Sequence, residues 1–133
     1  RVVQQLINKL GLNASRYSFA DGSGLSLYNY VSAELEVRLL RYAYSNQLIL
    51  NHLLPALPIA GVDGTLETRM RSPFTRSNVR AKTGTVMGVS SLCGYLTASN
   101  GHQICFSIIN QGIMHAKNGR RFQDRVCSIL CRP

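Results

Sequence analysis

The chain has 133 residues, of which 45% are hydrophobic and 16% charged, and its 15 Lys and Arg against 6 Asp and Glu give a net charge of +9. This composition can bury a core, which excludes a largely disordered chain, and the length fits one domain or part of one. No stretch approaches the roughly 20 apolar residues that a membrane-spanning helix needs.

The basic residues are spread along the chain, and their densest group, near the C-terminal end, is Lys117, Arg120, Arg121 and Arg125. A basic excess is typical of proteins that bind nucleic acid or an anionic surface. No zinc-finger, helix-turn-helix or RNP-type aromatic motif accompanies these residues. We therefore expect no nucleic-acid partner, and a nucleic-acid or polyanion binder is only the third of our three hypotheses.

The four cysteines are Cys93, Cys105, Cys127 and Cys131. We interpret them as buried small hydrophobic residues. Cys127 and Cys131 lie four residues apart on a predicted helix, but no histidine or second close cysteine pair completes a zinc-binding spacing. We expect no metal site, and the sequence leaves the pairing of the cysteines open.

The first part of the chain predicts two helices. Residues 2–10 carry an apolar stripe that ends at Gly11, a C-terminal cap. After the turn-rich residues 21–24, Ser32 is placed as the N-cap of a second helix, with acidic residues in its first turns. The buried face of this helix is expected to hold Leu35, Leu39, Tyr42 and Ala43.

The remainder predicts loops, strands and one more helix. Residues 53–64 contain two prolines, Gly61 and an Asp63-Gly64 turn, which favours a loop with at most short helical pieces. Strands are expected at residues 79–85, 89–97 and 104–110. A hairpin turn is expected at 99–101, and a final helix over about 117–131 should bury Phe122, Val126, Ile129 and Leu130. This order predicts an α+β fold, with an antiparallel sheet flanked by helices.

The segment most informative about chemistry is Lys82-Thr83-Gly84, followed by Thr85, at the end of a predicted strand. Such a triplet is one of three signatures of serine acyl-transferases that bind penicillin, although alone it also fits a solvated turn. Lys82 would place a positive charge beside the substrate carboxylate and the nucleophile network, and Thr83 would offer that carboxylate a hydroxyl. Gly84 would leave room for a substrate along the strand, and the Thr85 N–H would form half of an oxyanion hole.

The triplet belongs to a series of three sequence blocks. They are residues 21–26 (Asp-Gly-Ser-Gly-Leu-Ser) with Asn29, residues 57–66 with Arg69, and residues 81–85 with Gly88 and the strand 92–96. In this order the blocks resemble the C-terminal part of the class C low-molecular-mass penicillin-binding proteins, the D-alanyl-D-alanine carboxypeptidases and endopeptidases that trim peptidoglycan. The resemblance covers about residues 2–130.

The resemblance implies a serine hydrolase that forms an acyl-enzyme, with residues 1–133 as part of a penicillin-binding, transpeptidase-like (β-lactamase-like) domain. It implies Lys82 as a catalytic residue, and Thr83, Gly84 and Thr85 as substrate-binding residues. The implied partners are peptidoglycan stem peptides and β-lactams, with no cofactor, in a periplasmic or other extracytoplasmic location. We expect the other two blocks to serve as rigid turns.

Two motifs of the resembled family are missing. That family needs Ser-x-x-Lys, whose serine attacks while the lysine takes its proton, and Ser-x-Asn. No lysine here has a serine three positions before it, and no serine has an asparagine two positions after it. Ser23 lacks the Gly-x-Ser-x-Gly spacing, and the three histidines lack a partner pattern, so we expect no other nucleophile.

These absences, the first residue Arg1 and an amphipathic pattern from the start lead us to expect a C-terminal fragment of a longer enzyme, inactive by itself. Exposed sheet edges should make such a piece marginally stable or prone to associate. Our second hypothesis is a catalytically dead module of the same fold that binds wall peptides or a partner. Oligomeric state, membrane association and the carboxypeptidase-to-endopeptidase preference stay open.

Overall fold

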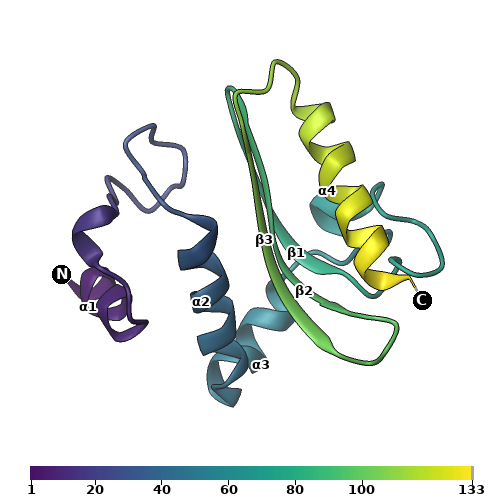
Figure 1. Ribbon diagram of the computed structural model, residues 1–133, viewed down its shortest axis with the longest axis horizontal. Helices are drawn as coiled ribbons and strands as arrows, with labels where there is room; N and C mark the ends of the chain where they lie inside the picture. The colour runs from purple at the N-terminus through teal and green to yellow at the C-terminus, as the bar shows by residue number, and fades with distance from the viewer. Residues whose placement is uncertain (133) are drawn as a thin grey trace.

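The computed structural model describes residues 1–132. Its elements in chain order are α1 (Val2–Lys9), η1 (Ala14–Arg16), α2 (Ala33–Tyr44), α3 (Gln47–Ala56), η2 (Gly64–Leu66), β1 (Arg80–Val86), β2 (Val89–Thr97), β3 (Gln103–Gln111) and α4 (Ala116–Cys131). Figure 1 shows α4 along one face of the sheet and α2 along the other, with α1 on the far side of α2. The predicted α+β class is confirmed.

The sheet is an antiparallel meander in the order β1-β2-β3. Lys82 of β1 lies opposite Cys93 of β2, which in turn lies opposite Ser107 of β3. Gly88 (φ +74°) closes the first hairpin and Gly101 (φ +82°) the second, at backbone angles that residues with a Cβ rarely adopt. The three predicted strands and the second hairpin are therefore confirmed, with strand ends shifted by one residue.

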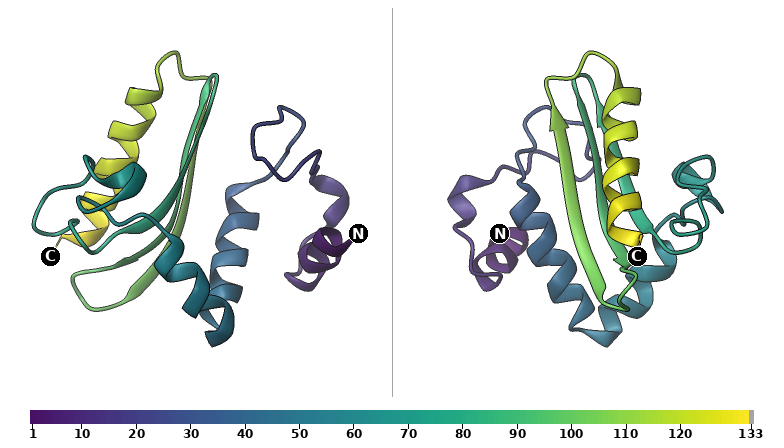
Figure 2. Two further views of the ribbon diagram at one scale, coloured as in Figure 1. Left: turned by 180° about the vertical axis from the view of Figure 1, so that it is seen from behind. Right: turned by 45° about the vertical axis from the view of Figure 1, so that its right-hand side comes forward.

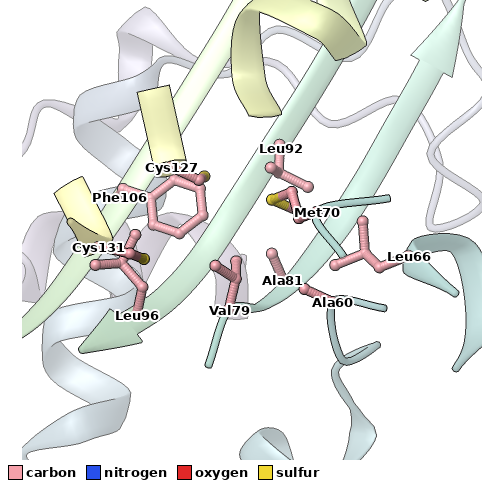
Figure 3. Packing of buried hydrophobic residues seen from close by; sticks show 10 residues of the cluster. All are labelled: Ala60, Leu66, Met70, Val79, Ala81, Leu92, Leu96, Phe106, Cys127 and Cys131. Carbon is pink, nitrogen blue, oxygen red and sulfur yellow. The ribbon is translucent and has the colours of Figure 1, made fainter. Parts of the chain in front are cut away.

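Successive side chains of each strand alternate between the two faces of the sheet. The face that packs against α4, seen in Figure 2, carries the larger core. Figure 3 shows its members, which are Ala60, Leu66, Met70, Val79, Ala81, Leu92, Leu96, Phe106, Cys127 and Cys131. On the α2 side, Leu40, Leu57 and Tyr95 are buried together, and the Tyr95 hydroxyl donates to the Leu40 carbonyl at 2.7 Å. That bond satisfies the polar atom of a buried side chain.

Two expectations about the helices before the sheet are wrong in part, although Leu35 and Ala43 of α2 are buried as expected. Ser32 does cap α2, since its hydroxyl accepts from the Leu35 N–H at 3.1 Å, but Leu40 is buried on α2 while Leu39 is 42% exposed. Residues 53–56 of the expected loop are instead the end of α3, whereas residues 57–63 form a loop as expected. Pro55 is tolerated there because it lies in the last turn, where it removes one intrahelical hydrogen bond just before the helix ends.

The expected extent of α4 is confirmed, but its expected buried face is wrong. Phe122 and Ile129 are 54% and 67% exposed, and neither Val126 nor Leu130 is fully buried. The buried residues repeat every four positions and are Gly119, Gln123, Cys127 and Cys131. Small residues on this face allow a close approach, since a Cβ on Gly119 would lie 2.9 Å from the Ser90 Cβ. All four cysteines are free; Cys127 and Cys131 are buried as expected, whereas Cys93 and Cys105 are half-buried.

A buried polar network ties the segment after η2 to α4. Arg69 Nε and Nη2 donate to the Asp124 carboxylate at 3.0 and 2.6 Å, and Nη2 also donates to the Gln123 side-chain oxygen at 3.0 Å. Gln123 is fully buried, and its amide donates to Ser90 and Asn110 on the sheet at 3.1 and 3.0 Å. The network therefore connects three separate parts of the fold through satisfied hydrogen bonds.

Replacing Asp124 with Asn should destabilise the protein by about 2–3 kcal/mol, because it leaves the Arg69 charge without its carboxylate in a site where Arg69 is only 10% exposed. Urea denaturation followed by circular dichroism measures this change. The matched control is Glu34→Gln, which removes an exposed ion pair with Arg38 and should cost at most about 0.5 kcal/mol. Equal losses in the two variants would contradict the importance of the buried network.

Candidate active site

The outer edge of β1 is paired at its start and free at its end. The Ala60 N–H donates to the Val79 carbonyl at 2.9 Å, and the Ala81 N–H donates to the Pro58 carbonyl at 3.0 Å. Residues 58–60 therefore extend the sheet only as far as Ala81. From Lys82 onward, none of residues 1–132 pairs with this edge. The expectation that the Lys-Thr-Gly triplet lies in a strand is confirmed, and the structure places that strand at the edge of the sheet.

The backbone of this free edge offers both donors and acceptors. Because the N–H of Ala81 points outward, the alternation of an antiparallel strand turns the N–H groups of Thr83 and Thr85 outward as well. The Lys82 ammonium donates to the outward Thr83 carbonyl at 2.6 Å. A ligand in extended conformation can pair with such an edge through main-chain hydrogen bonds.

The side chains of the triplet leave the strand on opposite faces. Ala81 is buried beneath α4, so Lys82 points to the α2 face, where it is exposed. Thr83 points the other way, and its hydroxyl donates to the Thr65 hydroxyl at 3.0 Å. A Cβ on Gly84 would meet only Ser91 within 4 Å, with the hydroxyl oxygen at 2.5 Å. The structure thus brings the predicted site residues together on one exposed strand end.

A polar group behind Lys82 was missed in the sequence. Cys93, directly across from Lys82, shares the space beneath α2 with Glu36, whose carboxylate accepts from the Ser107 hydroxyl at 2.6 Å. Burial raises the pKa of the Cys93 thiol from 9.0 to about 12; Glu36 adds to the rise and Lys82 opposes it. The thiol is therefore neutral near pH 7 and unsuited to nucleophilic attack. No sequence pattern links these residues, because only the docking of α2 on the sheet brings them together.

A cavity of about 590 Å³ opens on the Lys82 side of the sheet, between the ends of the strands and the loop before α2. Its wall includes Asp21, Glu36 and Ser91. The Asp21 carboxylate accepts from the Ser23 N–H at 3.2 Å and from the Asn29 amide at 3.1 Å, and the Asn29 bond lowers the Asp21 pKa. The first sequence block is thus a hydrogen-bonded turn, as expected, and it forms part of the cavity wall.

The second block, residues 57–66, reaches the triplet directly. The Ile59 N–H donates to the Asp63 carboxylate at 2.7 Å, which closes the turn that precedes η2. Thr65 lies exposed at this turn and accepts the hydrogen bond from Thr83. The expected structural role is therefore incomplete, because the block also contacts a candidate substrate-binding side chain. The only sequence signal for this contact was that Thr65 lies in the second block, residues 57–66.

The family model described as "D-Ala-D-Ala carboxypeptidase 3 (S13) family" matches residues 1–132. The chain belongs to this family. The match includes the edge strand with the Lys-Thr-Gly triplet and both of the preceding blocks. The resemblance to penicillin-binding carboxypeptidases seen in the sequence is thereby confirmed.

Curated S13 relatives are much longer than this chain. It is 40% identical over 106 residues to the D-alanyl-D-alanine carboxypeptidase DacB of Haemophilus influenzae, which covers 78% of this chain and 22% of that protein. It is also 40% identical over 115 residues to the D-alanyl-D-alanine carboxypeptidase of Actinomadura sp. (strain R39), covering 83% of this chain and 21% of that protein. The chain thus spans about a fifth of the length of these relatives.

Solved structures with a similar fold are also longer than this chain. Penicillin binding protein 4 (dacB) from Haemophilus influenzae superposes with a TM-score of 0.85 at 32% identity, over 98% of this chain and 31% of that one. A variant of the TLA-1 extended spectrum β-lactamase superposes with a TM-score of 0.71 at 18% identity, over 95% of this chain and 51% of that one, which shows a shared fold. The predicted partial β-lactamase-like domain is confirmed.

Residues 1–132 contain no candidate metal centre and no candidate membrane-spanning helix. No group of three or more His, Cys, Asp and Glu side chains is arranged to hold a metal ion within this part of the S13 chain. None of the helices described there has the length and apolar character needed to cross a bilayer.

Alkaline pH should destabilise the folded S13 chain. Burial raises the pKa of Cys93 and Cys127 from 9.0 to about 12, and that of Tyr95 from 10.0 to about 12. Between these values the unfolded chain loses protons that the folded chain keeps, so stability present below pH 9 is lost as the pH rises toward 12. Urea midpoints at pH 8.0 and 10.5 measure the loss. Cys127→Ala should flatten this dependence, and an unchanged slope would contradict the assignment.

Proposed function

We propose that this chain forms one wall of the active site of a serine-type D-Ala-D-Ala carboxypeptidase that acts on peptidoglycan stem peptides. The observation that carries the proposal is the exposed, unpaired end of β1, which holds Lys82, Thr83, Gly84 and Thr85 together. The family match and the names of the relatives supply the reaction class.

The proposed ligand lies in extended form along the free edge of β1. Thr83 donates its hydroxyl to the terminal carboxylate of the D-Ala-D-Ala peptide, and the Lys82 ammonium stabilises that negative charge. The Thr85 N–H, which points to the free edge, donates to the carbonyl oxygen of the bond to be cleaved. Gly84 keeps the strand surface clear, since a Cβ there would fill space that is now open except for Ser91.

In the proposed reaction, a serine outside these 133 residues attacks the carbonyl carbon of the penultimate D-Ala. Its proton passes to the neighbouring base and then to the amine of the departing D-Ala, as the C–N bond breaks and an ester forms with the serine. Water then attacks this ester, which releases the shortened peptide with a new carboxylate and restores the serine. A β-lactam would follow the first half of this course and acylate the same serine.

The nucleophile must come from elsewhere in the proposal, because the chain contains neither Ser-x-x-Lys nor Ser-x-Asn. Its relatives have about four-fifths of their length outside the matched region. We therefore propose that residues 1–133 are the C-terminal part of a longer enzyme and are inactive alone. Membership of a D-Ala-D-Ala carboxypeptidase family further supports an extracytoplasmic location. A net charge of +9 would favour contact with an anionic cell-wall polymer there.

A second candidate is a catalytically dead module of the same fold that binds wall peptides. The observation that favours it is the absence of both nucleophile motifs from the chain. The two candidates differ in the covalent step. The sequence that precedes Arg1 in the same gene distinguishes them, because only the enzyme needs Ser-x-x-Lys and Ser-x-Asn there.

Fluorescent penicillin should label the full-length protein on a serine that precedes Arg1, whereas the 133-residue chain alone should stay unlabelled, because acylation needs a nucleophile that the chain lacks. Denaturing gels and peptide mass spectrometry measure the label and its position. A full-length protein without label would overturn the proposed enzyme. Stable labelling of the short chain would show that it holds a nucleophile of its own.

Lys82→Ala in the full-length protein should lower the acylation rate constant about 10²- to 10³-fold, because the variant loses the charge that stabilises the bound anion. Stopped-flow fluorescence with the same penicillin gives this rate. Lys117→Ala is the matched control, since Lys117 is an exposed lysine at the start of α4. A similar loss in both variants would mean that general surface charge, not Lys82, governs the reaction.

A further inference from the structure

Thr65 contacts Thr83 just where the outer edge of β1 becomes free. The Thr83 hydroxyl donates to the Thr65 hydroxyl at 3.0 Å, across 18 positions of the chain. Thr65 is exposed and Thr83 half-buried, so both hydroxyls lie near solvent. A hydrogen bond between such hydroxyls adds little to folding, because water competes for both partners. A role for this hydrogen bond in ligand binding is therefore the better explanation, because both residues adjoin the free outer edge of β1.

The backbone on both sides of Thr65 is held in place. Gly64 has φ +53°, and a Cβ on it would lie 3.3 Å from the Pro58 ring, so the chain passes close to the segment that pairs with β1. Leu66 is fully buried in the core shown in Figure 3. The position of the Thr65 backbone thus follows from the packing of its two neighbours.

The polar network of Arg69, Asp124 and Gln123 fixes the next part of the same segment. Arg69, three residues beyond Leu66, is clamped to α4 by its bonds to Asp124 and Gln123. The segment is therefore fixed to β1 at one end, where residues 58–60 pair with the strand, and to α4 at the other. Thr65 lies between these two attachments, which place its hydroxyl within hydrogen-bond distance of the Thr83 side chain.

We propose that Thr65 is a positioning residue, whose hydroxyl holds the Thr83 side chain in the rotamer that presents its O–H to the ligand carboxylate. This inference rests on the proposed function, because that function assigns the carboxylate to Thr83. A hydroxyl has one proton and accepts through its lone pairs. Without ligand, Thr83 donates to Thr65.

When the carboxylate is bound, the direction of the hydrogen bond reverses. Thr65 turns its O–H toward the Thr83 oxygen, and Thr83 turns its own O–H toward the carboxylate. No proton is transferred, since only two hydroxyl groups rotate. The resulting chain from Thr65 through Thr83 to an anion is stronger than a single neutral bond, because the terminal acceptor is charged and each bond polarises the next.

The experiment compares the acylation rate constants of the full-length protein with benzylpenicillin and with its methyl ester, which lacks the carboxylate charge. Their ratio measures the preference for the carboxylate. Thr65→Val keeps the shape of the side chain but removes the hydroxyl, and it should lower the ratio about five- to tenfold, as expected for one hydrogen bond to this pair. Thr65→Ser, which restores the hydroxyl, should stay within about twofold of the wild type.

Two controls separate positioning from a structural role. Thr68→Val changes an exposed threonine in the same segment and should leave the ratio unchanged. In a Thr83→Val background, Thr65→Val should have no further effect on the ratio, because the group it positions is gone. A general disturbance of the loop would instead slow both compounds equally, and that result would overturn the inference.

The outcomes also separate this inference from the proposed function. A wild type that prefers the acid, with the same preference in Thr65→Val, overturns the role of Thr65 alone. A wild type that reacts equally with acid and ester overturns the assignment of the carboxylate to Thr83, and the role of Thr65 with it. A wild type that reacts with neither compound overturns the proposed enzyme and this inference together.

Discussion

The unequal pairing of the two edges of β1 is the constraint on which the rest of the structure depends. Its inner edge is bonded to β2 along the whole strand, while its outer edge is bonded to residues 58–60 only up to Ala81. An unpaired edge strand normally invites association with another strand. Here the unpaired part is the Lys-Thr-Gly segment. Its exposure leaves the strand open to association with another strand, but it also leaves backbone groups available to an extended ligand.

The layers on the two faces of the sheet give this edge its rigidity. On one face, α4 packs closely through Gly119, Cys127 and Cys131, and Gln123 joins the helix to β2 and β3. On the other face, α2 places Glu36 beside Cys93, and Tyr95 is buried with a bonded hydroxyl. None of the buried side-chain N and O atoms in residues 1–132 lacks a hydrogen-bond partner. A strand held this way can present its outer groups with little reorganisation.

The S13 chain contains the groups that we propose bind and orient a ligand, but its sequence has neither Ser-x-x-Lys nor Ser-x-Asn. In the proposed enzyme these groups and the serine can come from different parts of the chain, because β1 and the serine need only meet across the bound ligand. The contact between Thr65 and Thr83 brings the second sequence block to the outer edge of β1. The second block is therefore more than a separate turn, because it contacts the third block directly.

The sequence by itself determined the α+β class, the three strands, the second hairpin turn and the Ser32 cap, because alternation and turn residues are local signals. It also identified the triplet and its place in a strand. Only the tertiary structure decided which face of α4 is buried, that α3 extends through Pro55, and that Glu36 lies behind Lys82. Helix faces and contacts such as Thr65 to Thr83 depend on how distant segments dock, and a small residue that permits close approach can outweigh a larger apolar one.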